Sequence, residues 1–299
     1  MRIKKNLKWA LVLSGGGAKG YAHLGVLNVL EDMGVPRPSL IAGTSMGSII
    51  GGLYAAGVNL EKLKSFVLTE FDILQYLGKT KRRYKVNGPV GWVFQTGQML
   101  GNLATKSGMD SGEGILTLLD RFCEGKKIEE AEIPFRCNAV DLVSGRELVF
   151  RSGSIARAAR ASSSFPAFFE PLVEGGMLLV DGGICNNLPV YIARDEGFKR
   201  ILAVDVAGFE SIAGEKFSNG ARILYRTLEI AMHYSQMEKR NRPSLLINAA
   251  DDTSPLSFDK AGHLIELGEK AARERLRDLE KFFSGRRLFK HRMKVRDIQ

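Results

Sequence analysis

The chain has 299 residues, of which 44% are apolar and 25% are charged, as is typical of a folded protein with a sizeable core. These proportions exclude disorder along the whole chain. The 33 glycines are clustered, which excludes a collagen-like repeat, and three separated cysteines cannot form a disulfide framework or a four-ligand zinc site. The 43 basic and 33 acidic side chains leave a net charge of +10, which favours an anionic partner, either nucleic acid or an acidic lipid surface.

The first 57 residues predict two strand–helix units. Residues 9–13 predict a buried strand, because this apolar run is too short for the hydrophobic region of a signal peptide. A helix is expected over residues 18–33, a second strand over 40–42 and a second helix over 46–56. This order indicates a parallel sheet covered by helices.

Residues 39–60 contain no charged side chain and are long enough to span a bilayer. They also place Gly43, Gly47 and Gly51 at the spacing seen where membrane helices pack together. Five glycines and five Ser, Thr or Asn residues dilute the segment, so we interpret it as a strand, a tight turn and a buried helix. Without a predicted span or leader, we expect a cytoplasmic protein that can contact a membrane peripherally.

The rest of the chain predicts further strands and helices in a less regular order. Strands are expected over residues 135–140, 147–150, 177–180 and 201–204. Helices are expected over residues 59–78, 112–122, 155–161, 219–240 and 261–283. The sequence shows no internal repeat and no linker that would divide it.

Glycines crowd the turn after the first predicted strand, at Gly15, Gly16, Gly17 and Gly20. Their spacing matches the dinucleotide fingerprint, but the second strand lacks the acid that would bind the ribose. A P-loop is excluded because no Gly-Lys-Ser/Thr follows. Backbone amides at the start of a helix still favour negative charge, which is either a phosphate or an oxyanion formed in a transition state.

The second predicted strand runs into GTSMG at residues 43–47, a G-x-S-x-G sequence between a strand and a helix. In a nucleophile elbow, the two glycines leave room for a strained turn that projects the serine outward. The helix that follows favours negative charge near its start. Ser45 is therefore the candidate nucleophile.

A serine nucleophile needs a base, and Asp181 is better placed for this role than any histidine. Asp181 ends a predicted buried strand and precedes Gly182 and Gly183, which permit close approach. An aspartate acts as a general base where its surroundings raise its pKa from the usual ~3.9. We expect Asp181 and Ser45 to meet at one edge of the sheet. None of the histidines is expected in a turn after a strand: they are His23, His233, His263 and His291.

Four ordered blocks resemble the patatin-like phospholipase family. They are SGGGAKG at residues 14–20, GTSMG at 43–47, ASSSFP at 161–166 and DGGICNNLP at 181–189. The resemblance implies an α/β protein with three α/β/α layers, a mainly parallel central sheet and a helical C-terminal extension. We expect a catalytic domain over residues 8–210, a helical part over 211–283 packed on the same domain, and a basic tail over 284–299.

The resemblance also implies a serine acyl hydrolase that cleaves fatty-acyl esters of lipids and phospholipids without a metal or cofactor. It assigns Ser45 as the nucleophile and Asp181 as the base, with an oxyanion hole lined by Gly15, Gly16 and Gly17. Many relatives carry arginine at the position of Lys19. A lysine ammonium keeps the charge but cannot make the two parallel hydrogen bonds of a guanidinium, so we expect no direct substrate role for Lys19. The matched positions that support the site are Lys19, Gly20, Gly43, Gly47, Gly182 and Gly183.

Two other functions stay open from the sequence. An acyltransferase would pass the same acyl-serine to an alcohol or lysolipid, and a non-catalytic protein would use the glycine loop to bind a phosphate or nucleotide. The basic residues within 79–85 and in the tail suit either an anionic lipid surface or simple solvation. Neither region has the stacking pattern of a nucleic-acid module, so no nucleic acid is expected, and the oligomeric state is left open.

Overall fold

The computed structural model describes residues 3–69, 107–209, 211–217, 220–235 and 242–284. Its strands are β1 (Ala10–Leu13), β2 (Leu40–Gly43), β3 (Gly108–Asp110), β4 (Phe135–Asp141), β5 (Arg146–Phe150), β6 (Ala167–Phe169), β7 (Leu172–Glu174), β8 (Met177–Asp181), β9 (Ile201–Asp205) and β10 (Leu245–Asn248). Its α-helices are α1 (Ala22–Asp32), α2 (Met46–Ala55), α3 (Leu60–Thr69), α6 (Glu113–Cys123), α7 (Ile155–Ser162), α8 (Gly183–Asn186), α9 (Val190–Asp195), α10 (Gly220–Ser235), α11 (Ala261–Glu274) and α12 (Leu276–Phe283). Short 3₁₀ turns cover Gly17–Tyr21, Ile128–Glu130, Gly214–Lys216 and Phe258–Lys260.

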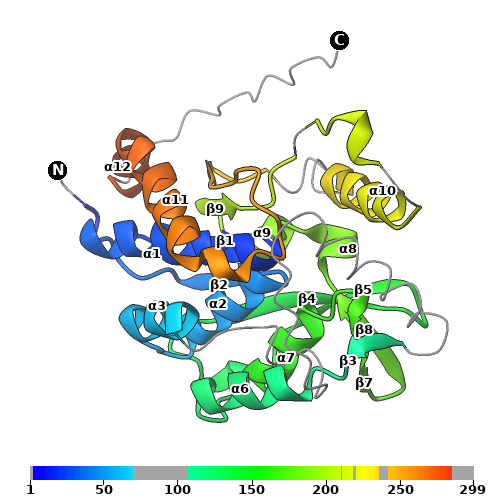
Figure 1. Ribbon diagram of the computed structural model, residues 1–299. Helices are drawn as coiled ribbons and strands as arrows, with labels where there is room; N and C mark the ends of the chain where they lie inside the picture. Colours follow the sequence, from blue (N-terminus) through cyan, green and yellow to red (C-terminus); the bar gives the residue numbers. More distant parts are fainter. Residues whose placement is uncertain (1–2, 70–106, 210, 218–219, 236–241, 285–299) are drawn as a thin grey trace.

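Within the described residues, eight strands form the central sheet, in the order β10-β9-β1-β2-β4-β8-β7 with β5 beside β4. The five strands from β10 to β4 run parallel, whereas β5, β8 and β7 run antiparallel to their neighbours. Strands β3 and β6 pair separately. The predicted α/β fold with a mainly parallel sheet is confirmed (Figure 1).

The alternation of side chains along β1 explains the three layers. Leu11 and Leu13 point into the larger core, which also contains buried side chains of α1, α2, α3, α11 and α12. Ala10 and Val12 point the opposite way, into a second core built largely on α9. Successive residues of a strand face opposite sides of a sheet, so a strand that is apolar at every position must be covered on both faces.

Helices α1 and α11 cover the larger core and touch through glycines. A Cβ atom on Gly25 would collide with the carbonyl oxygen of Ile265, and one on Gly268 would collide with that of Ala22. The two backbones approach this closely only because neither glycine has a side chain.

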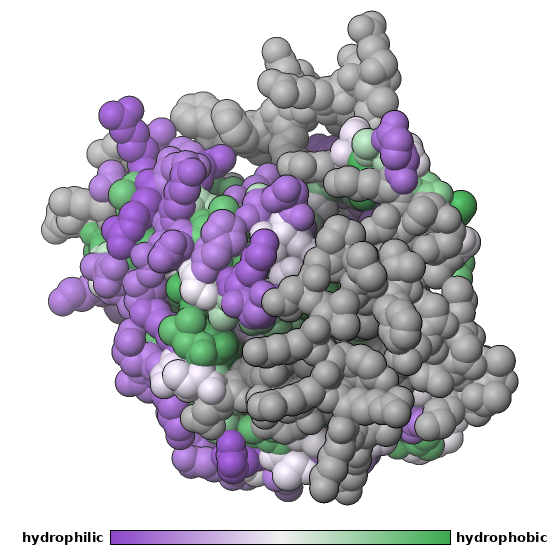
Figure 2. All heavy atoms as spheres, in the orientation of Figure 1, coloured by the Kyte–Doolittle hydropathy of each residue, from purple (hydrophilic) through white to green (hydrophobic). Residues whose placement is uncertain are grey.

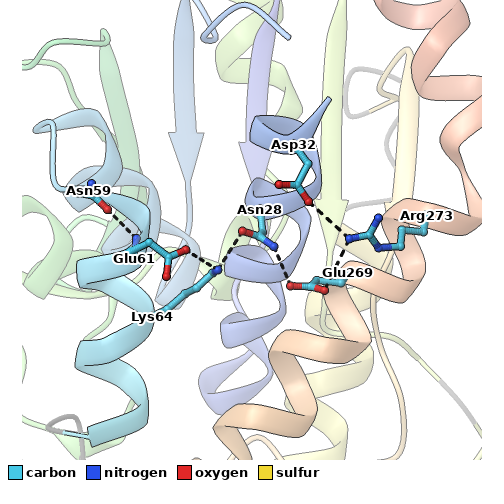
Figure 3. A network of polar contacts seen from close by, with 7 residues as sticks. All are labelled: Asn28, Asp32, Asn59, Glu61, Lys64, Glu269 and Arg273. Atoms are coloured by element: carbon cyan, nitrogen blue, oxygen red, sulfur yellow. Dashed lines mark hydrogen bonds and ion pairs between the residues drawn. The ribbon is translucent and has the colours of Figure 1, made fainter. Parts of the chain in front are cut away.

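A chain of polar contacts links the outer sides of α3, α1 and α11 (Figure 3). Lys64 Nζ donates to Asn28 Oδ1 at 2.9 Å, and Asn28 Nδ2 donates to Glu269 Oε1 at 2.9 Å. Arg273 then pairs with Asp32 at 3.5 Å and with Glu269 at 4.0 Å. The surface on this side of the molecule is largely hydrophilic (Figure 2).

The structure departs from the sequence predictions in several elements. The predicted helix over 18–33 opens with a 3₁₀ turn, and the predicted helix over 261–283 breaks between α11 and α12. Strand β10 was not predicted, because a run of three apolar residues does not by itself distinguish a strand from a helix. It adds a strand to the C-terminal part, for which the sequence predicted only helices.

Other predictions fall partly or wholly outside the described residues. These are the helix over 59–78 beyond Thr69, both ends of the helix over 219–240, the basic residues 79–85 and the tail from 285. Residues 39–60, the possible membrane span, form β2, the turn at Ser45 and α2. Across the described residues, no helix combines the length and apolar character needed to cross a bilayer.

Substitutions at two glycines of α11 test the close packing of α1 and α11. Gly268→Ala places a Cβ atom against the backbone of Ala22 and is expected to lower the free energy of unfolding by at least about 1–3 kcal/mol. Gly262→Ala is the matched control, because a Cβ there meets nothing within 4 Å; it should leave stability unchanged or raise it by up to about 1 kcal/mol. Urea unfolding measures both, and equal stabilities would contradict this packing.

Candidate active site

Ser45 occupies a strained turn between β2 and α2. Its backbone has φ 52° and ψ −123°, a conformation that residues with a side chain rarely adopt. The flanking glycines make the turn possible: a Cβ on Gly43 would collide with the Gly47 carbonyl oxygen, and one on Gly47 would collide with the Leu13 carbonyl oxygen. This is the geometry that the G-x-S-x-G sequence predicts.

Hydrogen bonds from neighbouring side chains hold this turn in place. Ser48 Oγ donates to the Ser45 carbonyl at 2.6 Å, and the Ser45 amide donates to Ser162 Oγ at 3.0 Å. Thr44 Oγ1 donates to Asn138 Oδ1 at 2.7 Å. Buried backbone groups in a turn need partners of this kind, because no regular ladder supplies them.

Asp181 ends β8, which runs antiparallel to β4. Asp181 pairs with Ala139 of β4, and Cys137 of the same strand pairs with Gly43 of β2. Ser45 follows Gly43 by two residues, just as Ala139 follows Cys137. Ser45 therefore lies at the same height along the strands as Asp181, on the other side of β4.

The Asp181 carboxylate is buried and accepts two hydrogen bonds. The amide of Gly183 donates to Oδ1 at 2.8 Å, and the hydroxyl of Ser45 donates to the same carboxylate. Burial raises the pKa of Asp181 to about 6, although both hydrogen bonds act in the opposite direction. The group is therefore ionised at neutral pH and much more basic than an ordinary aspartate.

The glycine loop approaches the Ser45 turn closely. A Cβ on Gly15 would lie 3.0 Å from Ser45 Cβ and would collide with Asn187 Oδ1. The Gly15 amide donates to the Asn187 carbonyl at 3.1 Å, so it is already occupied. The amides of Gly16 and Gly17 donate to no acceptor in the part of the chain that the structure describes. Among the three glycines predicted to line an oxyanion hole, these two offer amides for a ligand.

Lys19 holds the glycine loop in place through hydrogen bonds to two other segments of the chain. Its Nζ donates to the carbonyl oxygens of Ala207 at 3.2 Å and Asp251 at 2.8 Å, and the residue is only 9% exposed. These contacts tie the loop to the segments that follow β9 and β10. That Lys19 has no direct role with substrate stays a prediction.

The remaining glycines of the predicted site allow close contacts. A Cβ on Gly20 would collide with the Met46 side chain, and one on Gly182 would collide with the Asn138 carbonyl oxygen. A Cβ on Gly183 would lie 2.8 Å from the methyl group of Met232, on α10. Larger residues at these positions would therefore push apart the segments that carry Ser45 and Asp181.

Three of the four histidines lie within the described residues, and none of these is hydrogen-bonded to Ser45 or Asp181. His23 Nε2 bonds to the Ser14 carbonyl at 2.9 Å, and burial lowers its pKa to about 4, so the ring is neutral. His233 stacks on Phe209, and His263 pairs with Asp251. His291 lies outside the described residues. The same part of the chain holds no cluster of three or more His, Cys, Asp or Glu suited to a metal.

Two asparagines that join the motifs were assigned no role from the sequence. Asn138 Nδ2 donates to the carbonyls of Gly182 and Asn186 at 3.2 and 3.0 Å, and Asn187 Nδ2 donates to the Gly15 carbonyl at 3.3 Å. A polar side chain inside the apolar strand over 135–140 was the available signal for Asn138, because buried polar groups need partners.

The chain matches the family model of patatin-like phospholipase over residues 11–194. It is 32% identical over 209 residues to lysophospholipase NTE1 of Mycosarcoma maydis. It is 35% identical over 203 residues to patatin-like phospholipase domain-containing protein 6 of Homo sapiens. These alignments cover 70% and 66% of this chain but only 10% and 13% of the two relatives, which are far longer.

Among solved structures, the fold is similar to that of VipD from Legionella pneumophila, with a TM-score of 0.52. The superposition covers 92% of this chain and 68% of that chain at 15% sequence identity, so it compares the folds alone. The family model covers more than half of the chain and includes both Ser45 and Asp181. The chain belongs to the patatin-like phospholipase family.

Proposed function

We propose that this protein hydrolyses fatty-acyl esters of lipids through a dyad of Ser45 and Asp181. One observation carries the proposal: Ser45 lies level with the buried Asp181 across the sheet, and its hydroxyl is hydrogen-bonded to the Asp181 carboxylate. Burial raises the pKa of that carboxylate to about 6. The names of the relatives, a lysophospholipase and a patatin-like phospholipase, support a lipid ester as the substrate.

In the acylation step, Asp181 accepts the hydroxyl proton while Ser45 Oγ forms a bond to the ester carbonyl carbon. The carbonyl oxygen becomes an oxyanion, for which the amides of Gly16 and Gly17 are the candidate donors on the glycine loop. One such donor typically contributes about 10²–10³ in rate. The tetrahedral intermediate then breaks its bond to the alcohol, which leaves with the proton from Asp181, and an acyl-serine remains.

In the deacylation step, water replaces the departed alcohol. Asp181 accepts a proton from this water while the water oxygen forms a bond to the acyl carbon. The bond to Ser45 Oγ then breaks, Oγ regains the proton from Asp181, and the fatty acid is released. The same carboxylate therefore serves as base and acid in both steps, which suits a group whose pKa is raised to about 6.

We also infer that the protein takes its substrate from a lipid surface through contact near α10. This helix packs on α8, and its Met232 methyl lies beside Gly183, next to the dyad. Its exposed side chains include Ile223 at 53%, Leu224 at 65% and Tyr234 at 54%. An apolar helix surface beside the site, in a chain with a net charge of +10, suits peripheral contact with an anionic membrane.

Active-site labelling with a lipid-like phosphonate tests the two assigned roles. Ser45→Ala should abolish labelling, and Asp181→Asn should slow it by about 10²–10⁴-fold, the usual contribution of a general base. Ser65→Ala and Asp195→Asn, which are exposed positions away from the site, are the matched controls and should label like the wild type. Labelling of Ser45→Ala at the wild-type rate would contradict the proposal.

The pH dependence of turnover follows from the raised pKa of Asp181. Only the ionised carboxylate accepts a proton, so kcat/KM for a soluble short-chain ester should rise with pH through about 6 and level off above it. A profile that stays flat well below pH 6 would show that another group is the base. The rise of kcat/KM near pH 6 should also be absent from any residual activity of Asp181→Asn.

The raised pKa of Asp181 also predicts that the difference in unfolding free energy between the wild type and Asp181→Asn depends on pH. A carboxyl group whose pKa is raised on folding stabilises the protein below its unfolded pKa, and this contribution is lost as pH rises through the folded value. The shift from 3.8 to about 6 corresponds to about 3 kcal/mol. Asp181→Asn should therefore gain about 3 kcal/mol over the wild type as the pH rises from about 4 to about 7 in urea unfolding, with most of the gain between the unfolded and folded pKa values. A constant difference would show that the carboxylate is not buried.

A further inference from the structure

The segment at the end of α7 contacts both halves of the dyad. Ser162 Oγ accepts the Ser45 amide at 3.0 Å, and the Ser164 carbonyl accepts the Asp181 amide at 3.0 Å. Ser162 and Ser164 are both fully buried. Two residues apart in the chain, they hold the backbones of two groups that lie 136 residues apart in the sequence.

Arg160, in the last turn of α7, bonds this segment to two other parts of the chain. Arg160 is 1% exposed as a residue. Its guanidinium donates to the carbonyl oxygens of Ser111 at 2.9 Å, Gly112 at 3.2 Å and Glu170 at 3.0 Å. It also donates to the hydroxyl of Ser164. A buried guanidinium with several fixed acceptors makes a rigid support, because moving it would leave a charge and its donors unpaired.

The contact with Ser162 matters because of the backbone conformation of Ser45. With φ at 52°, the turn is strained and persists only where its surroundings hold it. Ser45 is also the first residue before α2, so its amide has no helical carbonyl to accept it. The Ser162 hydroxyl supplies that acceptor and fixes the point from which the Ser45 side chain leaves the backbone.

We propose that Ser162 is a positioning residue that holds the Ser45 turn in the orientation required for attack. The inference rests on the proposed function, since it assumes that Ser45 is the nucleophile. Ser162 acts through the backbone of Ser45, so its loss affects the rate of acylation. It leaves the affinity for substrate and the pKa of Asp181 largely unchanged.

The neighbouring Ser163 provides a matched control. It is the same residue type, is 9% exposed and lies one position further along the chain. Its hydroxyl donates to the Arg160 carbonyl at 3.3 Å, within its own helical turn, and not to the Ser45 backbone. Removing this hydroxyl deletes a buried serine oxygen from the same segment without touching the Ser45 amide.

The test compares Ser162→Ala, Ser163→Ala and Ser45→Ala with the wild type, using a soluble short-chain ester and the lipid-like phosphonate. For Ser162→Ala we expect kcat and the phosphonate labelling rate to fall together by about 10–100-fold, the effect of leaving one such donor unpaired. The KM of Ser162→Ala should stay within about threefold of the wild-type value. Its kcat/KM should still rise with pH near 6, as in the wild type. Ser163→Ala should remain within about twofold of the wild type.

Wild-type kcat for Ser162→Ala, or an equal loss for Ser163→Ala, would overturn the proposal. If Ser162→Ala does not fold, Ser162→Cys replaces it, because sulfur keeps the volume but is a weak acceptor. A folded Ser162→Cys protein with wild-type kcat would likewise overturn it. The Ser45→Ala arm separates the two hypotheses: activity that survives there defeats the proposed function itself, whereas its loss with an unaffected Ser162→Ala defeats only the role of Ser162.

Discussion

The proposed chemistry depends on one hydrogen bond, between the hydroxyl of Ser45 and a carboxylate that is almost excluded from water. Asp181 is 2% exposed, and burial outweighs its two hydrogen bonds, so that its pKa rises to about 6. An exposed aspartate would be too weak a base to activate a serine at neutral pH. Burial therefore allows a carboxylate to take the role that an imidazole has in many serine hydrolases.

The fold maintains this contact through segments that are distant in the sequence. Strand β8 runs antiparallel to β4 and brings Asp181 level with Ser45. Asn138 and Asn187 bond the segment after β8 to β4 and to the glycine loop. The glycines at the site leave room for these approaches, and the strain at Ser45 is confined to one residue whose neighbours hold it on both sides. Precise placement thus comes from backbone contacts between short motifs.

The sequence predicted those parts that depend on local patterns. Apolar runs located β1, β2 and β9, and the G-x-S-x-G spacing predicted the strained turn at Ser45. It could not predict the direction of β8, because strand pairing depends on contacts far away in the chain. It also could not show that the Gly15 amide is bonded to Asn187, or that Ser162 contacts Ser45. The roles of Ser45, Asp181 and the glycine loop, and the division of the chain near residue 210, stay predictions.

A crystal structure of the phosphonate-treated protein would show whether Ser45, Asp181 and the glycine loop act together on one reacting group. We expect phosphorus bonded to Ser45 Oγ, the phosphoryl oxygen within hydrogen-bond distance of the Gly16 and Gly17 amides, and the Asp181 carboxylate beside the modified serine. Phosphorus on another residue, or a phosphoryl oxygen turned away from the glycine loop towards solvent, would contradict this expectation.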